Sequence, residues 1–371
     1  MQKSTSPIIP GLIDDLGREC LIRIPYSDLP TGSSVSKTWR AEITGQDFGR
    51  FRKAEGVTRP VFILAQTQTD VSNLNSGQVV LKDDPVRPTY QLTVFDPFTR
   101  SWTLLPMIPG LPGGLPMFCG LVGSGTSVLV MGGWDPVTLR ASSGVYIYNF
   151  LSGKWKKGAD MPGVRRSFFG CATSDDGRMV VVAGGHDEDK NALKSALIYD
   201  VDKDMWTPLP DMARARDECK VIFHRGRFHV ISGYPTETQG IFERTAEAFD
   251  TSTWQWGPVI DNFVEPNSIP TSCVATPNGE IYACVDQHSG DMAVYAGDRW
   301  QVITKIPADV RSGQWMGANE ERKVVVIGSS KLGEPHEGYV LEMKGNNSKW
   351  SKVNVPKEYS GHVQCGCVLQ L

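Results

Sequence analysis

The sequence lacks any apolar run long enough to cross a membrane. Strand-like runs such as residues 323–328 are far shorter than the roughly 20 residues that a spanning helix needs. The first residues also carry no apolar segment of the kind found in signal peptides. We therefore expect a protein of the cytoplasm, the nucleus or both, with no membrane partner.

An excess of charge of one sign is also missing. The 371 residues include 38 basic and 41 acidic side chains, which leaves a net charge of −3 at neutral pH. A protein that binds nucleic acid through its phosphates needs a basic surface, and this composition does not indicate one. We expect no nucleic-acid partner.

The eight cysteines form no pattern of disulfides or metal ligands. Only Cys365 and Cys367 lie close together, and there is no Cys-x-x-Cys pair. The chain also lacks the HExxH and GxSxG motifs and a phosphate-binding glycine loop that leads into a helix. The sequence thus predicts no catalytic residue, no metal site and no cofactor.

What the sequence does contain is an internal repeat. Four segments share an aromatic residue and a polar turn former before a tryptophan, and two looser copies follow at intervals of 44 to 53 residues. We expect each tryptophan to lie in a hydrophobic core, because a buried indole removes a large apolar area from water. The six are Trp102, Trp155, Trp206, Trp256, Trp300 and Trp350.

A second set of repeated segments runs between the tryptophans. Apolar stretches that end in glycine recur, for example VLVMGG at residues 128–133 and VVVAGG at residues 180–185. Short segments with turn residues separate the two sets, as in SDDG at residues 174–177. Four antiparallel strands in about 50 residues are typical of one blade of a kelch β-propeller.

The strand count predicts how the ring closes. Five complete blades run from about residue 118 to residue 350, which leaves three strands near residues 59–105 and one at residues 362–371. Together these make a sixth blade, and pairing the two chain ends removes exposed sheet edges. The expected fold is mainly β, with a six-bladed kelch propeller over residues 56–371.

The repeat gives several cysteines and histidines a structural interpretation. Cys119, Cys171 and Cys219 each lie 13 residues before an equivalent position of the repeat. We therefore expect all three on the innermost strand, packed between blades. His224 and His229 flank a tight hairpin and are interpreted as structural or solvent-facing residues. Neither set predicts metal or redox chemistry.

Residues 1–55 have helical rather than strand periodicity. Asp14 and Asp15 can cap a first helix, a second helix follows a turn at Pro30, and residues 46–52 form a third short element. A unit of this size cannot build much of a core alone. A partner is therefore expected to cover part of its apolar surface.

This region resembles the F-box, the three-helix module that joins substrate receptors to the Skp adaptor of cullin-based ubiquitin ligases. IPGLIDDLGRECLIRIPYSDLP and the following VSKTWRAEI carry the resemblance. Ile13 and Ser36 depart from the usual proline and cysteine, and Gly17 and Gly32 weaken the helices. The resemblance implies contact with the Skp adaptor, and through it cullin, by Leu12, Ile13, Leu16, Ile24, Pro25, Val35 and Trp39.

An F-box followed directly by a kelch propeller is similar to the plant F-box/kelch-repeat proteins. Residues 184–220 and 228–250 resemble the subgroup that targets phenylalanine ammonia-lyase, with relatives directed at chalcone synthase or cytokinin-response regulators. The resemblance implies a non-catalytic receptor, with phenylalanine ammonia-lyase as the client to expect first. A kelch scaffold outside the ubiquitin pathway and a kelch enzyme are the alternatives.

Strand direction predicts where a client binds. Because neighbouring strands are antiparallel, the loops between the second and third strands of each blade share one face with the connections between blades. These loops are rich in arginine and aromatic residues, which are frequent in binding hot spots. The predicted client-binding face contains Trp134, Arg165, Arg166, His186, Asp187, Arg214, Arg216, Tyr234 and Arg311.

Two interpretations of these arginines stay open. They contact the client, or they pair with local acids such as Asp211, Asp217 and Glu218 and only order the loops. Residues 186–189, with the sequence HDED, follow two glycines and could suggest a metal site. Their place at the start of a client-face loop favours recognition or loop shaping instead.

Overall fold

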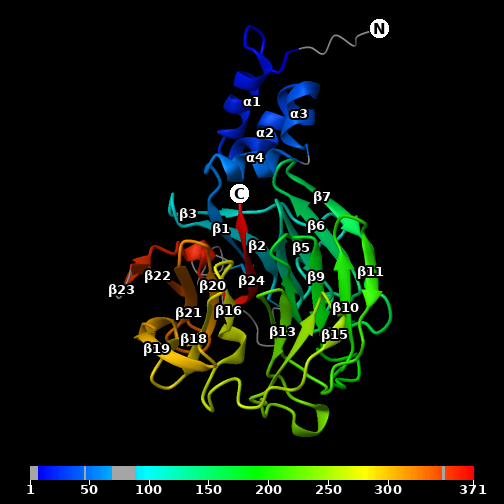
Figure 1. The fold of residues 1–371 in the computed structure, drawn as a ribbon, viewed down its shortest axis with the longest axis vertical. Helices are drawn as coiled ribbons and strands as arrows, with labels where there is room; N and C mark the ends of the chain where they lie inside the picture. Colours follow the sequence, from blue (N-terminus) through cyan, green and yellow to red (C-terminus); the bar gives the residue numbers. More distant parts are fainter. Residues whose placement is uncertain (1–6, 46, 69–87, 345–346) are drawn as a thin grey trace, which may run out of the picture.

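The computed structural model of this chain describes residues 7–45, 47–68, 88–344 and 347–371. It is a six-bladed β-propeller with a small group of helices on one side (Figure 1). Each of the six sheets has four antiparallel strands, which confirms the propeller expected from the repeats. No helix of the described residues is long and apolar enough to cross a membrane.

Five blades are formed by strands that follow one another in the chain. The first blade contains β4 (Gly120–Ser124), β5 (Ser127–Met131), β6 (Val145–Asn149) and β7 (Lys154–Gly158). The second contains β8 (Gly170–Thr173), β9 (Met179–Ala183), β10 (Ala196–Asp200) and β11 (Met205–Pro208). The third contains β12 (Lys220–His224), β13 (Arg227–Ile231), β14 (Ala246–Asp250) and β15 (Gln255–Trp256).

The fourth and fifth blades follow the same order. The fourth contains β16 (Val274–Ala275), β17 (Ile281–Asp286), β18 (Asp291–Ala296) and β19 (Arg299–Lys305). The fifth contains β20 (Ser312–Ala318), β21 (Lys323–Ser329), β22 (Glu337–Lys344) and β23 (Asn347–Val353). Short 3-10 helices lie in the connections at Thr236–Thr238, Pro270–Ser272, Ala308–Val310 and Lys357–Tyr359.

The sixth blade joins the two ends of the propeller. Its strand order is β24 (Val363–Gln370), β1 (Pro60–Thr67), β2 (Tyr90–Asp96) and β3 (Ser101–Leu104). Ile63 of β1 lies opposite Cys367 on one side and Val94 on the other. The inner strand β24 also lies beside β4 and β20 of the two neighbouring blades. Strand pairing therefore closes the ring.

The second strand of each blade is apolar because both of its faces are covered by neighbouring blades. In β9, residues 180–183 are fully buried. The chain then leaves the strand through Gly184 and Gly185, which both have positive φ. A Cβ atom on Gly184 would lie 2.2 Å from the carbonyl oxygen of Arg216, and one on Gly185 would lie 2.3 Å from that of Ser167. Only glycine fits this exit.

The repeated tryptophans lie on the outer strands and connect each blade to the one before it. Trp102 is buried and the others are partly buried. In five blades the indole Nε1 donates to a backbone carbonyl in the connection that follows the preceding outer strand, as from Trp206 to Ala159 at 2.8 Å. The Nε1 of Trp350 is buried without a partner among the described residues. The tryptophans thus combine core packing with a link between blades.

Four short helices, which we call the helical region, precede the propeller. They are α1 (Asp14–Ile22), α2 (Leu29–Val35), α3 (Lys37–Ile43) and α4 (Phe48–Ala54), with a 3-10 turn at Tyr26–Asp28. The expected second helix is divided at Ser36, whose backbone is extended and whose Oγ accepts from the backbone N–H of Trp39. Pro30 lies inside α2 rather than in a turn. Ile13, not an aspartate, occupies the N-cap of α1.

The helical region packs on the turns at one end of the propeller (Figure 1). Leu151, from the β6–β7 turn, belongs to the hydrophobic cluster that the helices form around Leu21 and Ile43. Lys53 pairs with Glu320 of the β20–β21 turn at 2.9 Å. The helices therefore cover the face where the first strand turns into the second, and the third into the fourth. The opposite face of the propeller, with its longer loops, is left open.

Candidate functional site

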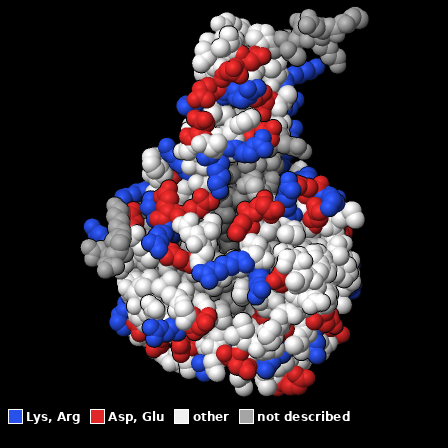
Figure 2. All heavy atoms as spheres, in the orientation of Figure 1, with Lys and Arg blue, Asp and Glu red and all other residues white. Residues whose placement is uncertain are grey.

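The helical region exposes four apolar side chains, at or near the start of α1 and at the end of α2. Leu12, Ile13, Leu16 and Val35 are exposed by 38 to 68 % of their surface. Figure 2 shows mostly uncharged atoms at the end of the helical region that points away from the propeller. We call these four residues the tip patch. An apolar cluster of this kind on a small unit indicates a protein-binding surface.

The other three predicted adaptor residues lie elsewhere. Ile24 and Trp39 pack against the helical core, and the Nε1 of Trp39 donates to the carbonyl of Ile8 at 2.7 Å. Pro25 is exposed on the side that faces the propeller. Of the seven predicted adaptor residues, four thus form the exposed tip patch and three do not belong to it.

The glycines of the helical region have a packing role. A Cβ atom on Gly17 would approach the Cβ of Ile8 to 3.0 Å, and one on Gly32 would approach the Cδ1 of Ile43 to 3.2 Å. Glycine costs helix stability relative to alanine, by about 1 kcal/mol per residue. At these two positions, however, glycine permits close contact of the helices with each other and with the segment before α1. The packing of this region therefore depends on these two positions having no side chain.

The open face of the propeller contains the predicted client residues, but several are buried. Arg166 and Arg216 are 1 and 0 % exposed, and His186 and Tyr234 are also buried. Their side chains are therefore not exposed for direct contact with a client in the free chain. Trp134, Asp187 and Arg311 are partly buried, and the Nε of Arg311 donates to the carbonyl of Ile306 at 2.8 Å.

Arg165 and Arg216 each follow a repeated tryptophan by ten residues, but they do not occupy equivalent positions in their blades. Arg166 and Arg216 are the matching pair, because both donate to the carbonyls at the end of the second strand and before the third strand of their own blade. The connection from Trp155 to Arg166 is one residue longer than the connection from Trp206 to Arg216. Equal spacing from the tryptophans therefore does not mean an equal position in the blade. Arg165 is exposed, and no carboxylate lies within ion-pair distance of it among the described residues.

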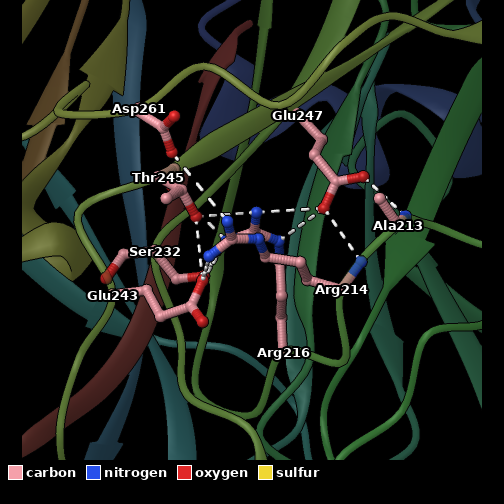
Figure 3. Close-up of polar contacts among 8 residues, drawn as sticks. All are labelled: Ala213, Arg214, Arg216, Ser232, Glu243, Thr245, Glu247 and Asp261. Carbon is pink, nitrogen blue, oxygen red and sulfur yellow. Dashed lines mark hydrogen bonds and ion pairs between the residues drawn. The ribbon is translucent and has the colours of Figure 1, made fainter.

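Arg216 is held by a buried carboxylate (Figure 3). Its Nε and Nη2 lie 3.1 and 3.0 Å from Oε1 of Glu247, which is fully buried. The other oxygen of Glu247 accepts from the backbone N–H of Ala213 at 2.7 Å. Arg214, at the edge of this cluster, pairs with Glu243 at 2.9 Å and keeps part of its surface exposed. These contacts favour the loop-ordering interpretation for Arg214 and Arg216.

Arg166 makes the same backbone contacts without a carboxylate. Leu197 occupies the position in β10 that Glu247 occupies in β14. The Nε of Arg166 has no hydrogen-bond partner among the described residues, and burial lowers the pKa of its guanidinium to about 10. The second and third blades therefore have a buried arginine at the same position, but only the arginine of the third blade is paired with a carboxylate.

His186 lies in a hydrogen-bonded chain that crosses three blades. Its Nε2 is 2.9 Å from Oγ of Ser167, and its Nδ1 is 2.8 Å from Oδ2 of Asp217. Trp134 of the first blade donates to the same Ser167 Oγ. This order of serine, histidine and acid matches that of a hydrolase triad, but Ser167 is fully buried, so a substrate cannot reach its oxygen. The chain is better interpreted as a brace for the loops.

The acidic residues after His186 shape their own loop. Oδ1 of Asp187 accepts from the backbone N–H groups of Asp189 and Asn191 at 2.9 and 2.8 Å. Tyr234, in the next blade, donates its hydroxyl to Glu218 at 2.8 Å. No group of three or more histidine, cysteine or acidic residues is arranged to hold a metal ion in the part of the chain that the structure describes.

Exposed apolar side chains on the open face were missed by the sequence analysis. Phe118 stacks on Phe168 with ring centroids 3.9 Å apart, and both have positive φ where a connection enters the inner strand. Their signal in the sequence was the presence of apolar residues inside loops. Together with Arg165 they form what we call the loop patch: Phe118, Val137, Leu139, Val164, Arg165, Ile241 and Phe242.

One of the three cysteines expected to be equivalent is not. Cys119 and Cys219 each lie one residue before an inner strand, whereas Cys171 is the second residue of β8. The turn between β8 and β9 is two residues longer than the matching turns, so equal spacing to the glycines did not mean equal position. Burial raises the pKa of Cys171 to about 12, which keeps its thiol protonated at neutral pH.

Comparison with known proteins agrees with this architecture. The Kelch motif model matches residues 117–162 and 165–213. The F-box/kelch-repeat protein At1g80440 of Arabidopsis thaliana is 45 % identical, over 98 % of this chain and 99 % of its own length. The chain belongs to the F-box/kelch-repeat family. The helical region is consistent with an F-box module, and we use that name for it below. A second Arabidopsis relative, the F-box/kelch-repeat protein At1g15670, is 44 % identical over 98 % of this chain and 99 % of its own length.

A solved structure supports the propeller at the level of fold. The protein of the structure titled "Structure of YjhT" aligns with a TM-score of 0.56 over 70 % of this F-box/kelch-repeat chain and 91 % of its own. The two are only 12 % identical, so this likeness concerns the fold alone. The names of the plant relatives indicate the class of protein but no client.

Proposed function

We propose that the protein is the substrate-recognition subunit of a Skp–cullin–F-box ubiquitin ligase. The observation that carries the proposal is that its two candidate binding surfaces lie at opposite ends: the tip patch on the F-box and the loop patch on the open face of the propeller. An adaptor and a client can therefore be bound together. Holding the client beside a charged ubiquitin carrier raises its local concentration, so the receptor needs no catalytic residue. We place it in the cytoplasm, the nucleus or both, where such ligases act.

Adaptor binding is tested by charge on the tip patch. Ile13→Asp with Val35→Asp places two carboxylates on exposed apolar positions without entering the helical core. A pull-down with purified Skp adaptor should retain wild type and lose the double variant. Leu332→Asp is the matched control, because Leu332 is 87 % exposed and lies on the propeller. Equal retention of wild type and the double variant would argue for a scaffold outside the ubiquitin pathway.

Client binding is tested on the loop patch. Val137 and Ile241 are 65 and 69 % exposed and come from the β5–β6 and β13–β14 loops. Val137→Asp with Ile241→Asp, and separately Arg165→Glu, should weaken client capture and leave adaptor binding unchanged. Interface hot spots typically cost about 2 kcal/mol or more when removed, so a drop of at least tenfold is expected.

We propose phenylalanine ammonia-lyase as the first client to test, which would make the protein a negative regulator of phenylpropanoid synthesis. Support for this choice is the resemblance of residues 184–220 and 228–250 to the subgroup that targets this enzyme. Chalcone synthase and a cytokinin-response regulator are the alternative clients. Purified samples of all three, compared in one pull-down, decide between them. Retention of another protein in place of the lyase would replace the proposed client and keep the receptor role.

A further inference from the structure

A cavity lies between the F-box and the propeller. It has a volume of about 630 Å³, which is in the range of small-molecule binding sites. The F-box contributes the segment after α1 and Arg52 of α4. The propeller contributes residues of β2, of β3 and of the turn after β6. A molecule bound here would contact both parts of the protein at once.

The charge of the cavity wall is positive. Arg23, Arg52 and Arg59 line it, against the side chain of Asp96 and the terminal carboxylate of Leu371. Asp96 is buried, and its Oδ1 already accepts from the backbone N–H of Phe98 at 2.8 Å. Figure 2 shows lysine and arginine atoms at the junction of the two parts. The balance of the wall therefore favours an anion.

Arg52 is the decisive residue. It is 4 % exposed, and its Nη1 donates to the backbone carbonyls of Ile22 and Ile24. No carboxylate lies within ion-pair distance of it in the described ranges, and burial lowers its pKa. Arg52 lines the cavity, and its Nε and Nη2 make no hydrogen bond within the described part of the chain. A buried cation of this kind is costly unless an anion compensates it.

Arg59 offers a second free guanidinium. It is exposed, and its guanidinium carbon lies 3.6 Å from the ring centroid of Phe98. No carboxylate of the described residues pairs with it, whereas Arg23 pairs with Glu19. A guanidinium without a carboxylate partner can make bidentate contact with phosphate or carboxylate.

The rest of the wall suits an aromatic or apolar body. Tyr26 and Phe150 meet edge to face with centroids 6.4 Å apart, and Tyr148 packs against the same Phe150 at 5.1 Å. Burial, with a smaller contribution from Asp96, raises the pKa of Tyr26 to about 12. Its hydroxyl is therefore neutral and able to donate a hydrogen bond. Val94 adds apolar surface.

We propose that this cavity binds a small anionic molecule, with a phosphate or carboxylate group on Arg52 and Arg59 and an aromatic body against Tyr26 and Tyr148. Such a ligand braces the F-box against the propeller. The inference does not rest on the receptor role, because it follows from the wall of the cavity alone.

The test uses the full chain and the fluorescent probe 4-methylumbelliferyl phosphate. The neutral 4-methylumbelliferyl glucoside reports on the aromatic body alone, and inorganic phosphate on the anion alone. We expect saturable binding of the phosphate ester with a Kd below about 1 mM, and weaker binding of both comparison compounds. No saturable binding of the ester, or equal binding of the glucoside or of inorganic phosphate, would overturn the proposal.

Variants locate the bound probe. Arg23→Gln with Arg59→Gln changes two exposed side chains, so folding should be preserved, and binding should weaken at least tenfold. Arg50→Gln is the matched control, because Arg50 lies on the same helix as Arg52 but outside the cavity. Thr103→Trp, at the cavity wall, should block the probe by filling space. Unchanged binding in the double variant also contradicts the assignment. Skp pull-down of the same variants reports separately on the receptor role.

Discussion

The paired and unpaired arginines of neighbouring blades allow a stability prediction with an internal control. Arg216→Leu leaves the carboxylate of Glu247 fully buried with only backbone N–H donors. Arg166→Leu leaves no buried carboxylate unpaired, since Leu197 occupies the position that Glu247 has in the third blade. Breaking a buried ion pair from one side costs about 3–5 kcal/mol, whereas loss of ordinary buried hydrogen bonds costs about 1–3 kcal/mol. We expect Arg216→Leu to be the more destabilising by about 2 kcal/mol.

A double-mutant cycle separates the ion pair from the rest of the cost. Glu247→Leu places in the third blade the leucine that the second blade has at the equivalent position, Leu197. Combined with Arg216→Leu it removes both charges, so the double variant should be less destabilised than the sum of the singles, by about 2 kcal/mol. Urea unfolding at pH 7, followed by tryptophan fluorescence and by circular dichroism, measures each free energy. Equal costs for the two arginine variants, or additive costs in the cycle, would refute the reasoning.

Three further predictions follow from other contacts. Trp206→Phe removes the Nε1 bond to Ala159 and should lower the free energy of unfolding by about 1 kcal/mol more than Trp350→Phe, whose Nε1 has no partner among the described residues; matched urea titrations compare them. Burial lowers the pKa of His336 to about 4, below its unfolded value of about 6.5. The stability it contributes is therefore complete above pH 6.5 and falls by at most about 3 kcal/mol toward pH 4, and His336→Gln should flatten that decline in urea midpoints. Deleting residues 362–371 removes β24 and should abolish the cooperative thermal transition, so a truncated chain that melts like wild type would contradict closure by this strand.

Part of the candidate site was predictable because it is encoded locally. The apolar residues Leu12, Ile13 and Leu16 are contiguous with the start of a helix, and their exposure follows from the small size of the unit. The position of the open face followed from the alternation of strand direction. Which single residues of that face are exposed could not be predicted in this way. Arg165 and Arg166 are neighbours in the sequence, yet Arg165 is exposed and Arg166 is buried.

The sequence by itself determined the number of blades, since an outer-strand tryptophan recurs six times at intervals of 44 to 53 residues and the strands left over at the two ends make up one blade. Only the tertiary structure decided which arginines are buried, because connections that differ by one or two residues shift each side chain relative to the strand ends. It also decided where the F-box sits, since Leu151 reaches its core from a turn more than 100 residues away. Local patterns specify elements, whereas contacts between distant segments specify which side chains are left for a partner or a ligand.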